Sequence, residues 1–192
     1  GDQRRGDLFA LHHQPRPVFA ATVAEVTERL AADGRVIEPL DEAQVLRDAE
    51  SLVRQGYRHA AVTLLHSYAY PQHELRVAEI LKQAGFIHVS SSSQIAPFTK
   101  ILPRAQSTVA NAYLTGPVES FLQGVARPMK EAAFFILNSA AGLESTTSIQ
   151  PKDLLLSGPA GGALGAANAA AQLGYARILT LDMGGTSTDV AR

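Results

Sequence analysis

The residues best suited to chemistry lie near the C-terminus. A short apolar run, 178–182, ends at Asp182 and is followed by Met183 and a glycine pair. Adjacent glycines let backbone N–H groups approach an anion, and consecutive N–H groups in a turn form an anion-binding concavity. The pattern predicts phosphate binding, with Asp182 holding Mg²⁺ through water or orienting an attacking water. A hairpin that binds no ligand stays open as the alternative. The predicted phosphate-binding residues are Gly184, Gly185, Thr186, Ser187, Thr188 and Asp189.

A helix of small residues precedes this segment. Of residues 158–173, four are glycine and seven are alanine. A glycine inside a helix costs about 1 kcal/mol relative to alanine, so close approach of a second backbone is a physical reason to keep several of them. A membrane helix is the alternative, but the segment is short and contains Asn168 and Gln172.

Two histidines and a carboxylate form a second candidate site. His66 follows a predicted strand, and His73 and Glu74 begin the next predicted helix, so the three side chains could converge. They could bind zinc, contact a substrate, or cap the ends of the strand and helix. Three basic residues are expected at the surface, with contact to a substrate carboxylate as the alternative for the second of them: Lys100, Arg104 and Arg127.

The elements that would position these residues alternate between helix and strand. Asp41 and Gln44 form a predicted capping box for a helix that stops at Gly56. The apolar run 59–65 is typical of a parallel strand that is buried on both faces. A helix from Pro71 to Gly85 and a strand over 86–90 complete a βαβ unit.

The flanking segments are predicted from weaker patterns. We expect a hairpin over 18–37, with a helix over 18–30 as the alternative, and a polar loop over 90–103. Residues 105–125 are helical in pattern, and Gly116-Pro117 should either divide them into two helices or kink a single one. Three further elements are expected: a strand over 133–137, a helix over 158–173 that stops at Gly174, and a buried strand over 178–182. Residues 134–181 hold four of the 35 charged residues, so this part of the chain is predicted to be the more deeply buried, against its own sheet or against a partner.

The composition excludes several classes of protein. The chain has 192 residues, 46% of them hydrophobic, and a net charge of −1, which gives no basic excess for a nucleic-acid partner. No apolar run reaches the roughly 18–20 residues that span a bilayer, so no membrane partner is expected. The absence of cysteine removes disulfides and a cysteine nucleophile, and a cytoplasmic location is the expectation.

The two glycine segments together resemble a known family. Ser157–Gly162 followed by Leu181–Val190 is similar to the hydantoinase/oxoprolinase family, and Arg35–Leu40, 65–68 and 111–114 agree with it. The stretch Gly85–Ser90 and the opening Asp7–Leu11 look most like the 5-oxoprolinase branch. The resemblance covers nearly the whole chain.

The resemblance implies a fold and an activity. The fold would be α/β, an incomplete actin-like (ribonuclease H-like) ATPase lobe, with most of the first lobe in residues 1–156 and the start of the second in 157–192. ATP and Mg²⁺ would be cofactors, and a cyclic amide such as 5-oxoproline or a hydantoin would be the substrate. The remaining lobes of the same enzyme, in a homo-oligomer, would be the partners. Three helix glycines would join the nucleotide site: Gly158, Gly161 and Gly162.

Two features depart from the family pattern. The family carries a glycine-rich phosphate loop near its N-terminus that this chain lacks, and its Ser-Asn/Asp-Gly-Gly turn is replaced by Asn138–Gly142, which reads Asn-Ser-Ala-Ala-Gly. The chain therefore resembles an internal piece of a larger enzyme. An ATP-dependent hydantoinase, an acetone-carboxylase-type subunit, or a binding module without turnover remain as alternatives.

Overall fold

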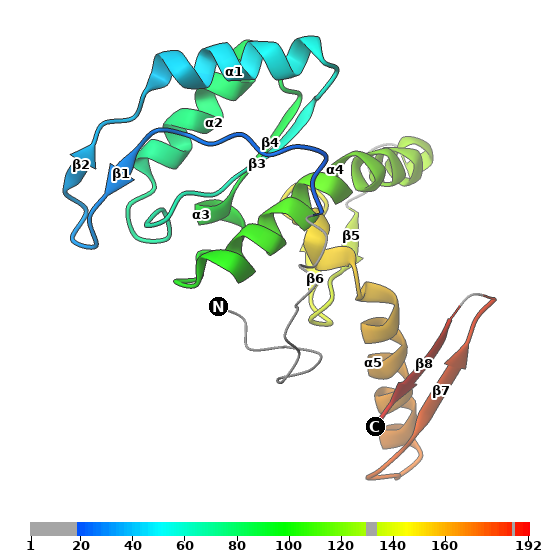
Figure 1. Ribbon diagram of the computed structural model, residues 1–192. Coiled ribbons are helices and arrows are strands. Elements are labelled where there is room, and N and C mark those ends of the chain that lie inside the picture. The colour runs from blue at the N-terminus through cyan, green and yellow to red at the C-terminus, as the bar shows by residue number, and fades with distance from the viewer. Residues whose placement is uncertain (1–18, 130–133, 186) are drawn as a thin grey trace, which may run out of the picture. The chain divides into compact units, whose positions relative to one another are not determined.

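The computed structural model describes residues 19–129, 134–185 and 187–192 of a mixed α/β chain (Figure 1). The chain divides into two compact units, Gly1–Gly116 and Pro117–Arg192. The opening segment used for the family resemblance and Thr186 lie outside the described residues. In the part of the chain that the structure describes, no helix is both long and apolar enough to cross a bilayer.

The first unit begins with the expected hairpin, which is shorter than predicted. Strands β1 (Arg29–Leu30) and β2 (Val36–Glu38) pair antiparallel. Gly34 turns the chain with a φ of 86°, and a Cβ at this position would come within 2.4 Å of the Tyr70 ring. The turn therefore depends on glycine for both conformation and space.

Helix α1 (Glu42–Arg54) begins and ends as the sequence predicts. Asp41 caps it by accepting a bond from the backbone N–H of Gln44 at 2.9 Å, and Gly56 follows the helix with a φ of 98°. The second bond of the predicted capping box, from the backbone N–H of Asp41 to the side chain of Gln44, is wrong. The Gln44 side chain instead bonds the backbone of Glu25 and Thr27, which ties the preceding extended segment to the helix.

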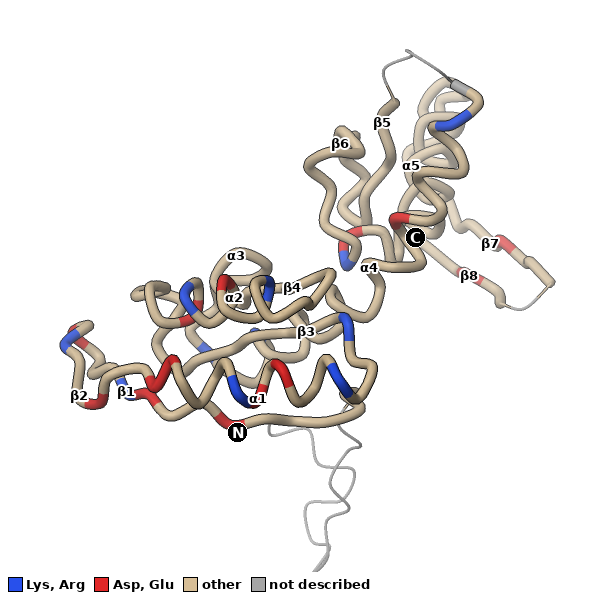
Figure 2. Tube along the Cα trace, turned by 90° about the horizontal axis from the view of Figure 1, so that it is seen from above, with Lys and Arg blue, Asp and Glu red and all other residues tan. Residues whose placement is uncertain are grey.

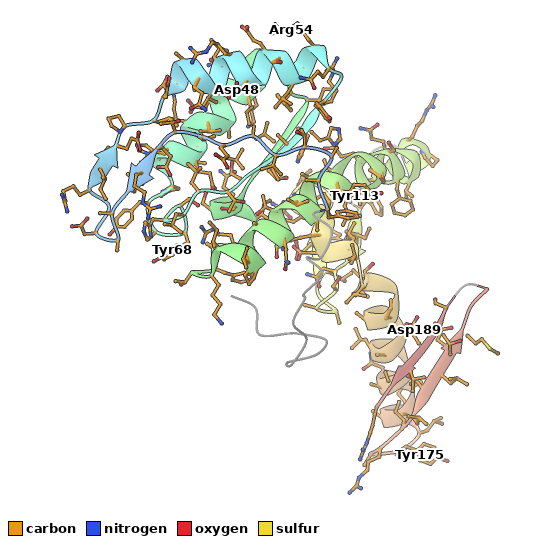
Figure 3. All side chains as sticks on the ribbon, viewed as in Figure 1. Asp48, Arg54, Tyr68, Tyr113, Tyr175 and Asp189 are labelled. Carbon is orange, nitrogen blue, oxygen red and sulfur yellow. The ribbon has the colours of Figure 1, made fainter. Side chains whose placement is uncertain are left out.

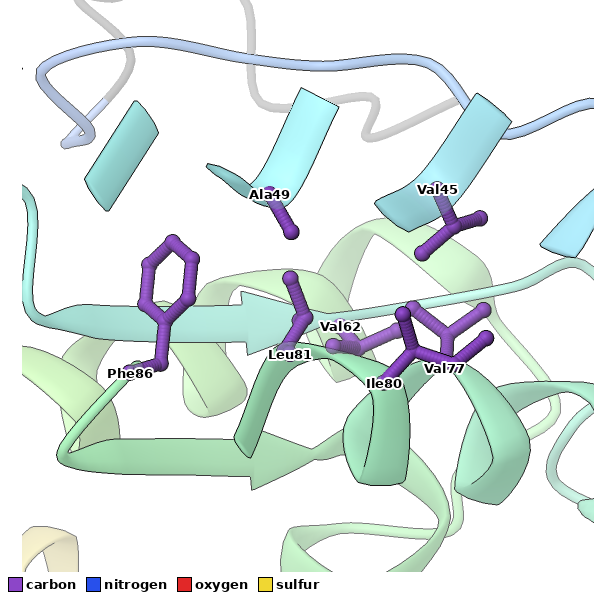
Figure 4. Packing of buried hydrophobic residues seen from close by; sticks show 7 residues of the cluster. All are labelled: Val45, Ala49, Val62, Val77, Ile80, Leu81 and Phe86. Atoms are coloured by element: carbon purple, nitrogen blue, oxygen red, sulfur yellow. The ribbon is translucent and has the colours of Figure 1, made fainter. Parts of the chain in front are cut away.

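The predicted βαβ unit is confirmed. Strands β3 (His59–Val62) and β4 (His88–Ser91) pair parallel, with His59 opposite His88, and helix α2 (Gln72–Ala84) connects them. Gly85 ends α2 with a φ of 111°. The core packs between α1, α2 and the sheet (Figure 4), and its buried members are Val45, Ala49, Val62, Val77, Ile80, Leu81 and Phe86.

The segment predicted as a polar loop contains two helices. Helix α3 (Ser92–Ile95) follows β4 directly, and α4 (Ile101–Met129) begins before Pro103. Of the two forms expected around Gly116-Pro117, the structure has a single helix, with Pro117 inside it. Hydrogen bonds from a buried arginine organise the loop between α3 and α4, as described below.

The second unit contains two antiparallel hairpins and one helix. Strands β5 (Phe135–Leu137) and β6 (Leu143–Ser145) form the first, and β7 (Thr180–Met183) and β8 (Thr188–Ala191) form the second. The 3₁₀ helix η1 (Pro151–Leu154) precedes α5 (Ser157–Gln172), which stops at Gly174 as expected. Of these elements, β6 and η1 were not predicted.

Few charges lie on this unit (Figure 2), yet many of its large apolar residues are exposed. Leu179, Leu181 and Met183 are 74%, 69% and 75% exposed. The prediction of a buried strand over 178–182 is therefore wrong for this chain. Two hairpins and a helix provide too few layers to cover both faces of a strand.

Candidate functional site

The β7–β8 hairpin brings two carboxylates together. Asp182 lies directly opposite Asp189 in the antiparallel register, so both side chains point to one face. Directly opposite residues have Cβ atoms about 4.5–5.5 Å apart, and like charges in such positions repel. The sequence singled out both residues but did not predict that they face each other.

The carboxylate face of the hairpin lies against α5. Together they border a cavity of about 330 Å³ that is open to solvent, and Asp189 lies on β8 beside the helix (Figure 3). A Cβ added to Gly162 would lie 3.8 Å from Oδ2 of Asp182, so the glycine keeps the helix surface open beside this carboxylate. The helix side of the cavity is lined by Pro159, Gly162, Ala163 and Ala166.

The opposite face of the hairpin is apolar and exposed. Leu181 pairs with Val190 and Met183 pairs with Thr188 on this face, where Leu181, Val190 and Met183 are 63–75% exposed. A hairpin that packs only for stability places its apolar side chains against the helix and its charges in solvent. Here the apolar side chains lie in solvent, Asp182 is exposed as well and Asp189 is partly buried, so the two carboxylates are accessible to a ligand.

The glycine turn differs from the predicted anion site in one respect. The N–H of Gly184 donates to the carbonyl of Ser187 at 2.9 Å, so it is not free to bind an anion. No atom of the described chain lies within 4 Å of a Cβ placed on Gly185, so its backbone is open to a ligand. Ser187 and Thr188 are exposed at the turn and the start of β8. Thr186 lies outside the described residues.

The remaining helix glycines have different surroundings. A Cβ at Gly161 would come within 2.9 Å of Cδ2 of Leu137, so this glycine allows α5 to pack on β5. Gly158 has open space around it. Only Gly162 of the three lines the carboxylate cavity.

The unusual turn at 138–142 is built by Asn138. Its side-chain oxygen accepts the N–H groups of Ala140 and Gly142 at 3.0 and 2.8 Å. Ala141 adopts a φ of 62°, the left-handed region that favours glycine. Ser139 donates to the carbonyl of Asp153 and accepts the N–H of Leu156, which joins the turn to the start of α5.

In the first unit, Glu74 is buried and fully engaged. Its carboxylate accepts the backbone N–H of Leu64 at 3.1 Å, the backbone N–H of Ser93 at 2.7 Å and the hydroxyl of Ser92 at 2.7 Å. Leu64 follows β3 and Ser92 follows β4, so Glu74 joins the carboxyl ends of both strands. Its predicted location at the start of a helix is confirmed.

Arg104 is also fully buried, so its predicted surface location is wrong. Its guanidinium donates to the carbonyls of Leu64, Leu65 and Phe98 and to Ser92 Oγ. The carbonyls of Leu64 and Leu65 accept from Arg104, and β3 ends at Val62, before the end of its apolar run. Burial lowers the pKa of Arg104, and Glu74 opposes this shift. The expectation of exposure holds for Lys100 and Arg127.

The two candidate histidines do not converge on a metal. His73 pairs with Glu28 through Nδ1 at 2.7 Å. Across the described ranges, no group of three histidine or acidic side chains could hold a metal ion. His66 differs from the other candidates, because its buried Nδ1 has no hydrogen-bond partner. Sequence reasoning gave no role in a site to Ser92, Ser93 or Glu28, since a run of serines (90–93) and one distant glutamate do not indicate which side chains meet.

The sequence of the chain matches two family models and several known proteins. Residues 1–85 match the family model "Hydantoinase/oxoprolinase N-terminal region", and residues 104–192 match "Hydantoinase/oxoprolinase". The 5-oxoprolinase of Saccharomyces cerevisiae is 33% identical over 100% of the chain. The chain spans 17% of the length of that relative.

Two solved structures have a similar fold. A nucleotide-free acetone carboxylase, from a study of ATP-dependent acetone carboxylation, matches with a TM-score of 0.78 and 31% identity over 86% of this chain and 25% of that chain. The ATP-dependent caprolactamase from Pseudomonas jessenii matches with a TM-score of 0.72 and 24% identity over the same shares.

Proposed function

Because the chain belongs to the hydantoinase/oxoprolinase family, we propose that it is a section of an ATP-dependent enzyme that opens a cyclic amide, with 5-oxo-L-proline as the substrate. The products would be L-glutamate, ADP and phosphate. The proposal rests on one observation above others, the pairing of Asp182 and Asp189 in a cavity beside a helix of small residues. The relatives described above support the reaction class.

The residues in the cavity fit a magnesium ion. Mg²⁺ prefers oxygen ligands and is held in nucleotide sites by one or two carboxylates, with water and phosphate oxygens as its other ligands. Asp182 and Asp189 supply two such carboxylates from a rigid hairpin, and Gly162 leaves room for the ion and its water. Bringing a cation between them also relieves the repulsion of two adjacent negative charges.

The chain would contribute binding and orientation to the reaction. When bound, ATP with Mg²⁺ supplies a phosphoryl group that activates the unreactive carbonyl of the cyclic amide. Asp182 would hold the metal through water or orient the attacking water, and Asp189 would share the metal. The open backbone at Gly185 and the hydroxyls of Ser187 and Thr188 would lie near the phosphates. Positioning and charge stabilisation account for most catalysis in phosphoryl transfer.

The proposed lobe assignment follows from the same reasoning. Residues 1–156 would be most of the first lobe of an actin-like ATPase fold, and 157–192 would begin the second lobe. Gly158 and Gly161 would belong to the helix between lobes. A homo-oligomer in the cytoplasm is part of this proposal. The chain alone is expected not to hydrolyse ATP, because it would hold only part of the phosphate enclosure.

The Asp182→Asn variant tests the proposal in the complete protein that carries this chain. Asparagine keeps the size of the side chain and removes its charge, so we expect the melting temperature to change little. Turnover of ATP and 5-oxo-L-proline should fall by roughly 10²–10⁴-fold, the usual worth of one catalytic group. Asp48→Asn on α1 is the matched control. Near-normal turnover in the Asp182→Asn variant would return the hairpin to a structural role.

An acetone-carboxylase-type activity is the second candidate. The similarity to acetone carboxylase at 31% identity favours it, because that enzyme also uses ATP and acts on a carbonyl compound. Product analysis separates the two candidates. Release of L-glutamate from 5-oxo-L-proline supports the first, whereas bicarbonate-dependent use of a ketone supports the second. A protein that binds ATP without turnover of either substrate would be a binding module.

A further inference from the structure

We propose that the carboxyl ends of β3 and β4 carry a second site, in which His66 and Ser93 bind a small compound through a carbonyl or carboxylate oxygen. This inference rests on the proposed function, in which a cyclic amide is the substrate, but the site uses none of the residues of the carboxylate cavity. It lies in the first unit, where the chain leaves each of two parallel strands. Ligands of parallel α/β sheets commonly bind outside the carboxyl ends of the strands.

Two buried polar atoms in this region have no partner. Among the described residues, Nδ1 of His66 and Oγ of Ser93 are the buried side-chain nitrogen and oxygen atoms without a hydrogen bond. His66 lies just after β3 and Ser93 lies just after β4. Buried polar atoms are nearly always hydrogen-bonded, and each exception calls for a partner such as a ligand or water.

The neighbouring polar groups are already occupied. The Glu74 carboxylate accepts three hydrogen bonds, from Leu64, Ser92 and Ser93. The Arg104 guanidinium donates from its Nε, Nη1 and Nη2 atoms to Ser92 Oγ and to backbone carbonyls. An incoming ligand therefore meets His66 and Ser93 as its available partners. The other candidates for substrate contact, His73, Glu74 and Arg104, are bonded within the fold, whereas Nδ1 of His66 is not.

The same network fixes the two free groups in place. Glu74 holds the backbone N–H of Ser93 at 2.7 Å, and Arg104 holds the carbonyl of Leu65, the residue before His66, at 2.9 Å. Ser92 Oγ joins Glu74 to Arg104, because it donates a hydrogen bond to Glu74 and accepts one from Arg104. Side chains on segments clamped by buried hydrogen bonds are well suited to binding, because little ordering remains to be done.

The chemistry of the two groups selects the ligand class. A hydroxyl O–H donates, and so does Nδ1 of an imidazole in the tautomer that carries its proton there, so together they recognise an oxygen that accepts two hydrogen bonds. Lactam and carboxylate oxygens have this capacity. The nearby buried charges of Glu74 and Arg104 have opposite signs, so a neutral amide meets no net charge. The His66 ring also lies 6.3 Å from the ring of Tyr68, which provides an apolar side.

A binding experiment with the 192-residue chain tests the proposal. The ¹⁵N-labelled chain is titrated separately with 2-pyrrolidone, which has only the lactam carbonyl, and with acetate, which has only the carboxylate. We expect one or both to shift the His66 ring nitrogen and the Ser93 backbone amide. The compound that binds identifies the source of the oxygen. If neither shifts these signals at millimolar concentration, the proposal is wrong.

Variants separate a binding role from a structural one. Ser93→Ala and His66→Phe each remove one donor and should weaken binding about tenfold, the effect of one hydrogen bond. Ser51→Ala on α1 is the matched control, and Asp182→Asn should leave this binding unchanged whatever happens at the carboxylate cavity.

The stability of the ligand-free variants provides a further readout. Ser93→Ala keeps the backbone N–H that bonds Glu74, so the fold should persist, and removal of an unpaired hydroxyl should not lower the melting temperature. If instead Ser93→Ala lowers the melting temperature and neither compound raises that of the parent chain, a structural water fills the site and the proposal fails.

Discussion

Neutralising one carboxylate of the β7–β8 hairpin should stabilise the metal-free chain and weaken its binding of Mg²⁺. Asp182 and Asp189 are direct cross-strand neighbours. Like charges in such positions destabilise a pair by roughly 0.2–1 kcal/mol. Asp182→Asn removes this repulsion and keeps the shape of the side chain, so the free energy of local opening should rise by that amount.

Hydrogen exchange of the ladder amides of β7 and β8 measures this directly. A rise of roughly 0.2–1 kcal/mol slows exchange by about 1.4- to 5-fold, since 1.36 kcal/mol is tenfold. The measurement is made in EDTA, so that no divalent ion masks the repulsion. Asp189→Asn should give the same gain. The double variant should gain nothing further, because either single change already removes the repulsion.

Addition of Mg²⁺ should reverse the order of stability. The ion binds the native hairpin with both carboxylates and slows exchange in the parent chain through mass action. In Asp182→Asn the slowing should be smaller, whereas Asp48→Asn should behave as the parent does. Faster exchange of Asp182→Asn in EDTA would refute the repulsion argument. An absence of any Mg²⁺ effect on the parent hairpin would refute the metal site.

Three further predictions concern stability and pH. Ala141→Gly should stabilise the chain by about 1 kcal/mol in urea unfolding, because Ala141 has a φ of 62°, whereas Ala140→Gly should destabilise it. Gly34→Ala should lower the melting temperature by several degrees, because its φ is 86° and a Cβ would overlap a tyrosine ring. Hydrogen bonding to Arg76 holds the pKa of Glu42 below 4.5, so this pair stabilises the fold above that pH and the contribution is lost as pH falls through the lowered pKa. Arg76→Gln should return the Glu42 titration, followed by carboxyl-carbon NMR, to its ordinary value.

The parts of the fold that are set by local chemistry were predictable from the sequence. Asp41 and Gly56 mark the ends of α1, and Gly85 marks the end of α2, because each meets a requirement of the adjacent backbone. The parallel pairing of β3 and β4 followed from an apolar run on either side of an amphipathic helix. These predictions needed no knowledge of distant residues.

The parts that depend on distant partners were not predictable. Arg104 reads as a surface charge in the sequence, and its burial depends on carbonyls nearly forty residues earlier that β3 leaves unpaired. The side chain of Gln44 had a local partner available and bonds Glu25 and Thr27 instead. The second unit was expected to be buried because it has few charges, but low charge predicts burial only where a covering layer exists.

The contrast between Glu74 and Asp182 shows how the structure separates two carboxylates that the sequence treats alike. Both residues were candidates for a site. Asp182 lies near the end of a strand, just before a glycine pair, and Glu74 lies at the start of a helix beside His73. Glu74 is buried, and its oxygens accept two backbone N–H groups and a hydroxyl, so its hydrogen-bonding capacity is used within the fold. No hydrogen bond or ion pair joins the side chain of Asp182 to another described residue, and the residue opposite it in the hairpin is another carboxylate. A carboxylate whose partners are supplied by the fold stabilises that fold, whereas two cross-strand carboxylates that repel each other leave their oxygens available to the cation that we propose. The same test, applied to His66 and His73, leaves His66 as the histidine with binding capacity, since His73 is paired with Glu28.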